Sequence, residues 1–379
     1  MLMQNREVYL QSMSGCCSAG LSSDEIFEST LLGKSGVKKH QGYLNDESLS
    51  AIGKIDSTKS FDSLMIERVE EILANVEMEN FHNTFLAVGT SVGGMSWAEN
   101  QFIEDNGSYR NIKLKKQSIH SIAHTLNKKF NFKDSITFST ACTSSSNAIV
   151  FAKELIEVGA YDDVLVVGAD SISYTTVNGF NALGVLSSEC ATPFDIDRIG
   201  MNVAEGVGVI LLGDRPTDIG LVGVGCSSDA YNITNPHPDG VGAKKAMQNA
   251  LDNANIKSID IDYINAHGTA TVANDSAEGK AIVELFGDRP IVGSTKSTTG
   301  HTLGACGAIE LIISAMAIRE QKVPSNFNLK NRELDGLNLA TKTVSKDIKY
   351  VLSNAFAFGG NNVSIILKKI TTEEVENEN

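Results

Sequence analysis

The sequence predicts an α/β fold made of two similar halves, each built around a mixed and buried sheet. Two observations carry this prediction. Short apolar runs alternate with segments of helical pattern through the first part of the chain, and the same alternation starts again near residue 220. No low-complexity linker separates the halves. We expect the halves to span residues 6–219 and 220–370, followed by a disordered acidic tail at residues 371–379.

The elements can be placed in order along the chain. A helix begins at Ser23, with Asp24 and Glu25 in its first turn. The strands expected in the first half are 8–13, 85–89, 135–139 and 164–168, with a helix at 144–158. In the second half, strands are expected at 220–225, 262–266, 291–294, 350–354 and 363–368, and helices at 242–253, 275–286 and 305–319.

The composition is that of a globular protein, with 42% hydrophobic and 21% charged residues in 379. No apolar run is long enough for a membrane helix, and residues 1–10 lack the apolar core of a signal peptide, so we expect a cytoplasmic protein. Six scattered cysteines without a CxxC pair argue against a disulfide framework or a structural zinc. A net charge of −14 disfavours nucleic acid or an anionic membrane as partner.

One basic segment runs against this acidic balance. Residues 107–133 contain no acid and carry seven cations: Arg110, Lys113, Lys115, Lys116, Lys128, Lys129 and Lys133. Such a patch could dock an acidic protein. The alternative is that these residues form the solvated faces of a helix and its flanking loops.

Cys142 is the first candidate for chemistry. It lies in FSTACTSSSNAI, between an expected strand and an expected helix start. Backbone N–H groups and the helix dipole at that position should favour its thiolate, and a sharp turn would present the sulfur to a substrate carbonyl. The alternative is an inert buried cysteine.

Two histidines occupy similar places in the second half. His267 follows a strand in NAHGTAT, and His301 follows STKSTTG ahead of a Gly-rich turn. Loops at the carboxyl ends of strands are where sites gather in α/β sheets. A lone histidine is more often structural, but two in equivalent loops together with Cys142 indicate an active site.

Three further residues are weaker candidates for the active site: Lys296, Glu310 and Phe358. Lys296 precedes His301 by five residues and Glu310 follows it by nine, so they are either surface residues or a buried ion pair. Phe358 lies in SNAFAFGGNN, where its backbone N–H could face a Cys142 adduct as part of an oxyanion hole. A simple hairpin turn with a buried phenylalanine is the alternative.

Taken together, these motifs resemble the elongating β-ketoacyl-(acyl carrier protein) synthases. The resemblance covers about residues 6 to 370 and rests on the order and spacing of five segments: TACTSS, NAHGTAT, STKSTTGHTLGACGAIE, NAFAFGGNN and PFDIDR. LLGKSGV and SSDAYNITNPHPDG match as well. The resemblance implies the thiolase fold, with duplicated βαβαβαββ halves in a five-layered α-β-α-β-α core, usually as a dimer.

The resemblance also implies a role for each residue. Cys142 takes an acyl group from the phosphopantetheine of an acyl carrier protein. His267 and His301 bind the malonyl thioester and promote its decarboxylation. Lys296 and Glu310 are similar to a buried ion pair that supports the second histidine.

The remaining implied roles concern the substrate arm and its acyl group. The N–H groups of Cys142 and Phe358 hold the oxyanion, and Phe358 also gates the acyl pocket. Thr269 and Thr271 bind the pantetheine arm, and Gly359 is part of the same substrate contact. No metal and no diffusible cofactor is implied.

The resemblance names partners too. Arg110, Lys113, Lys115 and Lys116 would dock the acidic carrier protein. The synthase would form a homodimer, or a heterodimer with a subunit similar to a chain-length factor. Three positions depart from the fatty-acid pattern: AFGGNN stands for GFGGTN, HGTATVAND for HGTSTPxGD, and Thr192 for an arginine that commonly contacts the carrier. The HGTATVAND segment is more similar to polyene or type II polyketide ketosynthases, and fatty-acid elongation is the alternative.

Four alternative functions fit these residues less well. A scaffold similar to a chain-length factor would lack the nucleophile, and a thiolase would need a second cysteine later than Cys306. A synthase acting on free coenzyme A would use Cys-His-Asn, whereas His301 lies in the TGH setting. A cysteine hydrolase would leave His301 and Lys296 without a role.

Overall fold

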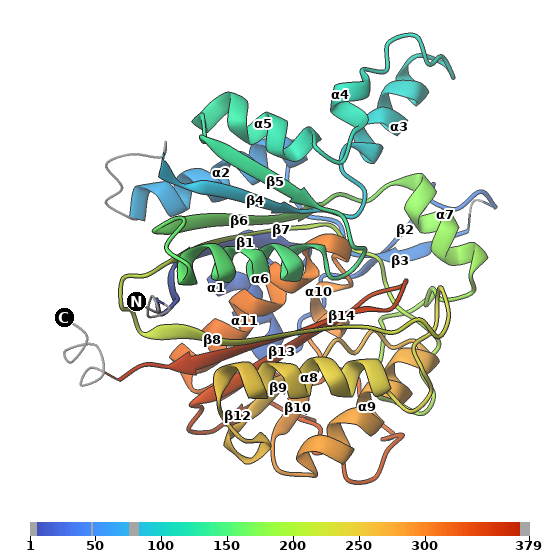
Figure 1. Ribbon diagram of the computed structural model, residues 1–379. Helices are drawn as coiled ribbons and strands as arrows, with labels where there is room; N and C mark the ends of the chain where they lie inside the picture. Colours follow the sequence, from blue (N-terminus) through green and yellow to red (C-terminus); the bar gives the residue numbers. More distant parts are fainter. Residues whose placement is uncertain (1–5, 47, 76–82, 372–379) are drawn as a thin grey trace.

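The computed structural model describes residues 6–46, 48–75 and 83–371, so most of the acidic tail, expected to be disordered, lies outside the described residues. Its centre is a ten-stranded sheet in the order β10-β9-β13-β14-β8-β1-β7-β6-β4-β5 (Figure 1). The two halves of this sheet meet where Tyr9 of β1 pairs with Gly220 of β8. Each half thus forms a separate layer of the molecule (Figure 1).

The first half of the sheet contains five strands, in the order β5-β4-β6-β7-β1. Their bounds are β1 Tyr9–Cys17, β4 Phe85–Gly89, β5 Asp134–Phe138, β6 Asp163–Asp170 and β7 Gly206–Gly213. Strands β5, β4 and β6 run parallel, whereas β7 pairs antiparallel with both β6 and β1.

The second half repeats this arrangement strand for strand. Its bounds are β8 Ile219–Ser228, β9 Tyr263–Asn265, β10 Ile291–Gly293, β13 Tyr350–Phe356 and β14 Asn361–Lys369. Strands β10, β9 and β13 run parallel, and β14 pairs antiparallel with β13 and β8. Because order and direction both recur, the predicted duplication with mixed sheets is confirmed.

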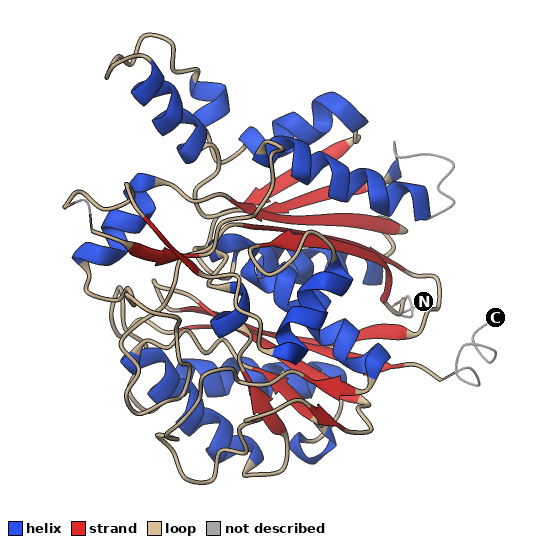
Figure 2. Cartoon of the chain, turned by 180° about the vertical axis from the view of Figure 1, so that it is seen from behind, coloured by secondary structure: helices blue, strands red, loops and turns tan. Residues whose placement is uncertain are grey.

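Helices form the other three layers (Figures 1 and 2). Between the half-sheets lie α1 Ser23–Leu32, α6 Ser144–Glu157, α10 Lys296–Thr299 and α11 Cys306–Glu320. Helices α2 Phe61–Asn75 and α5 Ser121–Phe130 cover the outer face of the first half-sheet, and α8 Val241–Ala254 and α9 Val272–Phe286 cover that of the second. The five-layered core that the resemblance implied is therefore present.

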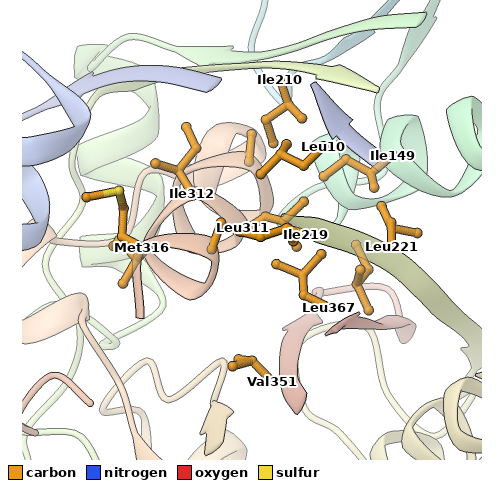
Figure 3. Close-up of a cluster of buried hydrophobic side chains, with 14 of the residues drawn as sticks. Leu10, Ile149, Ile210, Ile219, Leu221, Leu311, Ile312, Met316, Val351 and Leu367 are labelled. Carbon is orange, nitrogen blue, oxygen red and sulfur yellow. The ribbon is translucent and has the colours of Figure 1, made fainter. Parts of the chain in front are cut away.

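The central layer contains the largest hydrophobic cluster. Helix α11 is mainly apolar, and its residues from Cys306 to Ile318 are all buried. Figure 3 shows Leu311, Ile312 and Met316 of α11 among side chains of both half-sheets, including Ile210 and Leu367. Each fully buried leucine or isoleucine contributes about 1.5–3 kcal/mol, so this helix holds the halves together.

The remaining elements lie at the periphery. Helices α3 Met95–Glu104 and α4 Leu114–Gln117 project beyond the first half-sheet, and α7 Tyr174–Ala182 lies beside the hairpin of β2 Lys38–His40 and β3 Ser50–Ile52 (Figure 1). Strands β11 Lys322–Val323 and β12 Val344–Ser345 form a second small pair. No helix in the described part of the chain is long and apolar enough to cross a membrane.

Candidate active site

The candidate residues gather at the carboxyl ends of the parallel strands. Cys142 follows β5 and His301 follows β10, which occupy the same position in the two half-sheets. His267 follows β9, and Phe358 follows β13. The two halves therefore bring their strand ends to one place, where Cys142, His267 and His301 lie together.

Cys142 stands on a tight turn immediately before α6. Ala141 has a left-handed backbone with φ 53°, and its carbonyl accepts hydrogen bonds from the N–H and the hydroxyl of Ser144 at 3.1 and 2.6 Å. The thiol of Cys306 donates to the carbonyl of Cys142 at 3.1 Å. The turn thus fixes the backbone on both sides of the sulfur.

The Cys142 thiol differs from the sequence expectation. Burial raises the pKa of Cys142 to about 11, and the opposing influences of Lys296 and of the N–H groups of Phe358 and Cys142 are smaller. The expectation that the helix start favours the thiolate was therefore wrong, because loss of solvent outweighs it. A neutral thiol needs a base close by.

His301 is that base by position. Its Nε2 lies 3.0 Å from Sγ of Cys142. Two hydrogen bonds hold the backbone of His301. Its N–H donates to the carbonyl of Asn202 at 2.7 Å, and its carbonyl accepts from the N–H of Ala204 at 2.9 Å. Burial and the charge of Lys296 lower the pKa of His301 well below its usual value. The imidazole is therefore neutral and able to accept a proton.

His267 completes the centre. Its ring lies 5.4 Å from that of His301, at an interplanar angle of 87°. Burial lowers the pKa of His267 well below its usual value, with Lys296 and His301 acting in the same direction. The N–H groups of His267 and Gly268 donate to the two carboxylate oxygens of Glu278, each at 2.8 Å, and this bidentate contact fixes the loop.

Lys296 and Glu310 form a buried ion pair, with each residue 2% exposed. Nζ of Lys296 donates to the carbonyl of His267 at 2.6 Å and lies 3.4 Å from Nδ1 of the same ring. The resemblance implied support of the second histidine, but the contact is with the first. From the short helix α10, Lys296 reaches the loop after β9.

Phe358 supplies a backbone N–H to the sulfur of Cys142, beside the N–H of Cys142 itself. Two glycines with positive φ follow, Gly359 at 87° and Gly360 at 78°, and they make the turn between β13 and β14. The ring of Phe358 lies 6.0 Å from that of Phe180 on α7. Two donors therefore converge where a carbonyl oxygen bound at Cys142 would develop charge.

A cavity of about 360 Å³ opens onto these groups. Cys142, His267, His301, Phe358 and Gly359 line it, as do Thr269 and Thr271, whose hydroxyls lie 2.9 Å apart. Its walls are mainly apolar. Lys296 and Glu310 lie behind the lining and act on the cavity through His267.

Comparisons with known proteins agree with this geometry. The N-terminal domain of the β-ketoacyl synthases matches residues 22–217, and their C-terminal domain matches residues 220–330. The chain belongs to the β-ketoacyl synthase family.

Two curated relatives and one solved structure illustrate the membership. The 3-oxoacyl-(acyl-carrier-protein) synthase 2 of Vibrio cholerae is 34% identical over 332 residues, with 80% of each chain covered. That of Rhizobium meliloti is 40% identical over 253 residues, and this match spans only 60% of the relative's length. A ketosynthase from Xenorhabdus doucetiae, solved in complex with its chain length factor, is 30% identical with a TM-score of 0.90, covering 96% of this chain and 98% of that one.

The site of this synthase also has the ligand types of a thiophilic metal site. Single ligand atoms of Cys142, His267 and His301 lie within 4.8 Å of one another. However, the ammonium of Lys296 beside Nδ1 of His267 adds positive charge where a dication would sit. Donation from Lys296 also leaves the proton of His267 on Nε2, the nitrogen that a metal would need. The cluster fits proton transfer better than metal binding.

The basic residues expected to dock the carrier protein lie outside the cavity. Arg110, Lys113, Lys115 and Lys116 are all exposed on or near α4, and none of them lines the cavity. Lys116 packs over the ring of Trp97, 4.7 Å from its centroid.

The sequence analysis did not identify Glu278, because an acidic residue in a helical segment is usually solvent-exposed.

Proposed function

We propose that this synthase elongates an acyl chain by decarboxylative condensation with a malonyl group, both carried on the phosphopantetheine of an acyl carrier protein. The observation that carries the proposal is the contact between Cys142 and His301 beside His267, in the wall of one mainly apolar cavity. A nucleophile, a neutral base and a second neutral imidazole are the groups that this reaction needs.

The first step loads the acyl group. His301 takes the thiol proton of Cys142 through Nε2, and the sulfur attacks the thioester carbonyl. The oxyanion accepts hydrogen bonds from the N–H groups of Cys142 and Phe358. Collapse breaks the bond to the carrier, whose thiolate leaves with the proton from His301.

The second step makes the carbon–carbon bond. The malonyl thioester loses CO2, and the enolate oxygen accepts a hydrogen bond from the Nε2–H of His267. Lys296 supports this role, since its donation towards Nδ1 of His267 leaves Nε2 as the protonated nitrogen. The enolate carbon attacks the acyl carbonyl, the bond to Cys142 breaks, and the thiolate takes up one proton from solvent, which neutralises the negative charge left behind when CO2 departed.

The partner assignments belong to the same proposal. Thr269 and Thr271 hold the pantetheine arm, and Gly359 allows its close approach; no metal and no diffusible cofactor takes part. The carrier docks on Arg110, Lys113, Lys115 and Lys116, whose exposed charges fit an acidic protein. A cytoplasmic dimer, with a second copy or a subunit similar to a chain length factor, is the expected assembly, and a polyene or type II polyketide chain the expected product class.

The test is an elongation assay. Purified protein receives octanoyl carrier protein and malonyl carrier protein, and the products are identified by mass spectrometry. We expect a 3-oxodecanoyl carrier protein and CO2 in equal amounts, and no product without the malonyl carrier. Free octanoic acid without any elongated product would instead indicate a thioester hydrolase and contradict the proposal.

A further inference from the structure

Asp170, the last residue of β6, is a fully buried carboxylate outside the substrate cavity. Among the described residues, no lysine, arginine or histidine forms an ion pair with it. A buried charge without a counter-ion is costly unless donors surround it. The groups around Asp170 must therefore supply hydrogen bonds to its carboxylate.

Backbone donors from both halves of the molecule satisfy Asp170. In the loop after β4, Oδ1 accepts the hydroxyl of Thr90 and the N–H groups of Ser91 and Val92, each N–H at 3.1 Å. Oδ2 accepts the N–H of Ser91 at 2.8 Å and the N–H of Gly304 at 2.7 Å. Gly304 belongs to the second half and follows His301 by three residues.

Two of these donors, Ser91 and Gly304, connect Asp170 to the turns that carry Cys142 and His301. The hydroxyl of Ser91 donates to the carbonyl of Ala141, next to Cys142, at 2.9 Å. Gly304 lies in the turn that connects His301 to α11, where Leu303 has a left-handed backbone with φ 53°. A side chain at Gly304 would lie 2.6 Å from the Ser91 nitrogen and 2.7 Å from Oδ2 of Asp170. The absence of a side chain there permits the contact.

We propose that Asp170 is the positioning residue that holds the Cys142 turn and the His301 turn at reacting distance across the two halves. The inference rests on the proposed function for its catalytic meaning. In structural terms, the 3.0 Å contact between Sγ of Cys142 and Nε2 of His301 depends on the carboxylate of Asp170.

Replacement of Asp170 by asparagine should preserve the contacts of Oδ1 and remove those of Oδ2. An asparagine has one acceptor oxygen, which suits the Oδ1 side with its three donors. Its amide NH2 would then face the N–H groups of Gly304 and Ser91, donor against donor. We expect D170N to keep the loop after β4 and to release Gly304, which moves His301 away from the sulfur.

The experiment measures alkylation by iodoacetamide across pH 6–10, resolved by peptide mass spectrometry. Cys226 is exposed and serves as the reference thiol on the same molecule. We expect D170N to lower the Cys142 to Cys226 rate ratio near pH 7 by about 10²-fold, the cost of displacing a catalytic group by about 1 Å. The control is D163N at the other end of β6, which removes the charge of a contact with Arg215 far from Gly304 and should leave the ratio unchanged.

A second variant guards against misfolding. G304A inserts a methyl group into the same contact without changing any charge, and it should lower the ratio in the same way. The double variant D170N/G304A should be no slower than the slower single variant, because both remove one contact. A wild-type ratio in folded D170N or in folded G304A would overturn the proposal. Alkylation needs no acyl substrate, so the outcome is independent of the elongation assay.

Discussion

The ammonium of Lys296 lies against His267 and not against His301: Nζ is 3.4 Å from Nδ1 of His267 and donates to its carbonyl at 2.6 Å. The buried ion pair with Glu310 holds the ammonium in place. Because a charged donor faces Nδ1, the proton of the neutral ring lies on Nε2, towards the cavity. The ion pair therefore determines which histidine is a hydrogen-bond donor, while His301 remains free to act as base towards Cys142.

Removal of one partner of this pair should cost stability. K296M leaves Glu310 buried and unpaired, and we expect a loss of about 3–5 kcal/mol in the free energy of unfolding, measured in urea. The double variant K296M/E310M replaces both charges by apolar side chains and should regain most of that loss. It should still fail to elongate, because Nδ1 of His267 has lost its donor. Elongation by the double variant at the wild-type rate would refute the role assigned to Lys296.

The pH dependence of Cys142 should reveal His301. The raised pKa, about 11, means that little free thiolate exists near neutral pH, so reaction there depends on proton transfer to His301. We expect H301A to slow alkylation of Cys142 near pH 7 by about 10²–10⁴-fold. The alkaline limb, which rises as pH approaches the thiol pKa, should remain. A parallel loss at every pH would mean that His301 acts only on structure.

The turn at Gly359 should control the oxyanion hole. G359A places a side chain at φ 87°, where a Cβ meets no atom within 4 Å but the backbone is strained. Relaxation would rotate the N–H of Phe358 away from Cys142. Loss of one such donor lowers acylation by about 10²–10³-fold.

Gly42 offers a matched control. Its φ is 84°, and a Cβ there also meets no atom within 4 Å. G42A carries the same backbone cost away from the cavity, so its acylation rate should be that of the wild type. Equal losses in the two variants would show that backbone strain alone, and not the donor at Phe358, explains the effect.

Charge reversal on α4 tests the carrier surface. K113E/K115E should raise KM for the acyl carrier protein with little change in kcat, and the difference should shrink with added salt. K245E, at an exposed position on α8, makes the same kind of charge change elsewhere and is the control. Lys116 is left intact because it packs on Trp97. An unchanged KM in the double variant would place the carrier on another face.

The sequence was most informative where pattern and position coincide. The strand predicted at residues 85–89 has those bounds, and Cys142, His267 and His301 meet because each lies beyond the carboxyl end of a parallel strand. The helix predicted at 275–286 begins earlier, at Val272, and β7 was not predicted, although its glycine-rich apolar run is buried throughout. Contacts that depend on the direction of one short turn, such as Lys296 on His267, leave no periodic signal.

Electrostatics were the least predictable part of the site. The sequence places Cys142 at a helix start, but the depth of the cavity decides its pKa, and burial dominates. Asp170 ends an apolar strand without any sign of the donors that reach it from residues 90–92 and 304. Such networks arise from loops far apart in the chain, and only the folded arrangement shows them.

The most direct test of the account is the intact mass of the protein after incubation with octanoyl carrier protein alone. We expect one added octanoyl group on the wild-type protein, none on C142A, and its loss when malonyl carrier protein follows. An unmodified wild-type protein, with the carrier still fully loaded, would contradict the central claim that Cys142 carries the acyl chain.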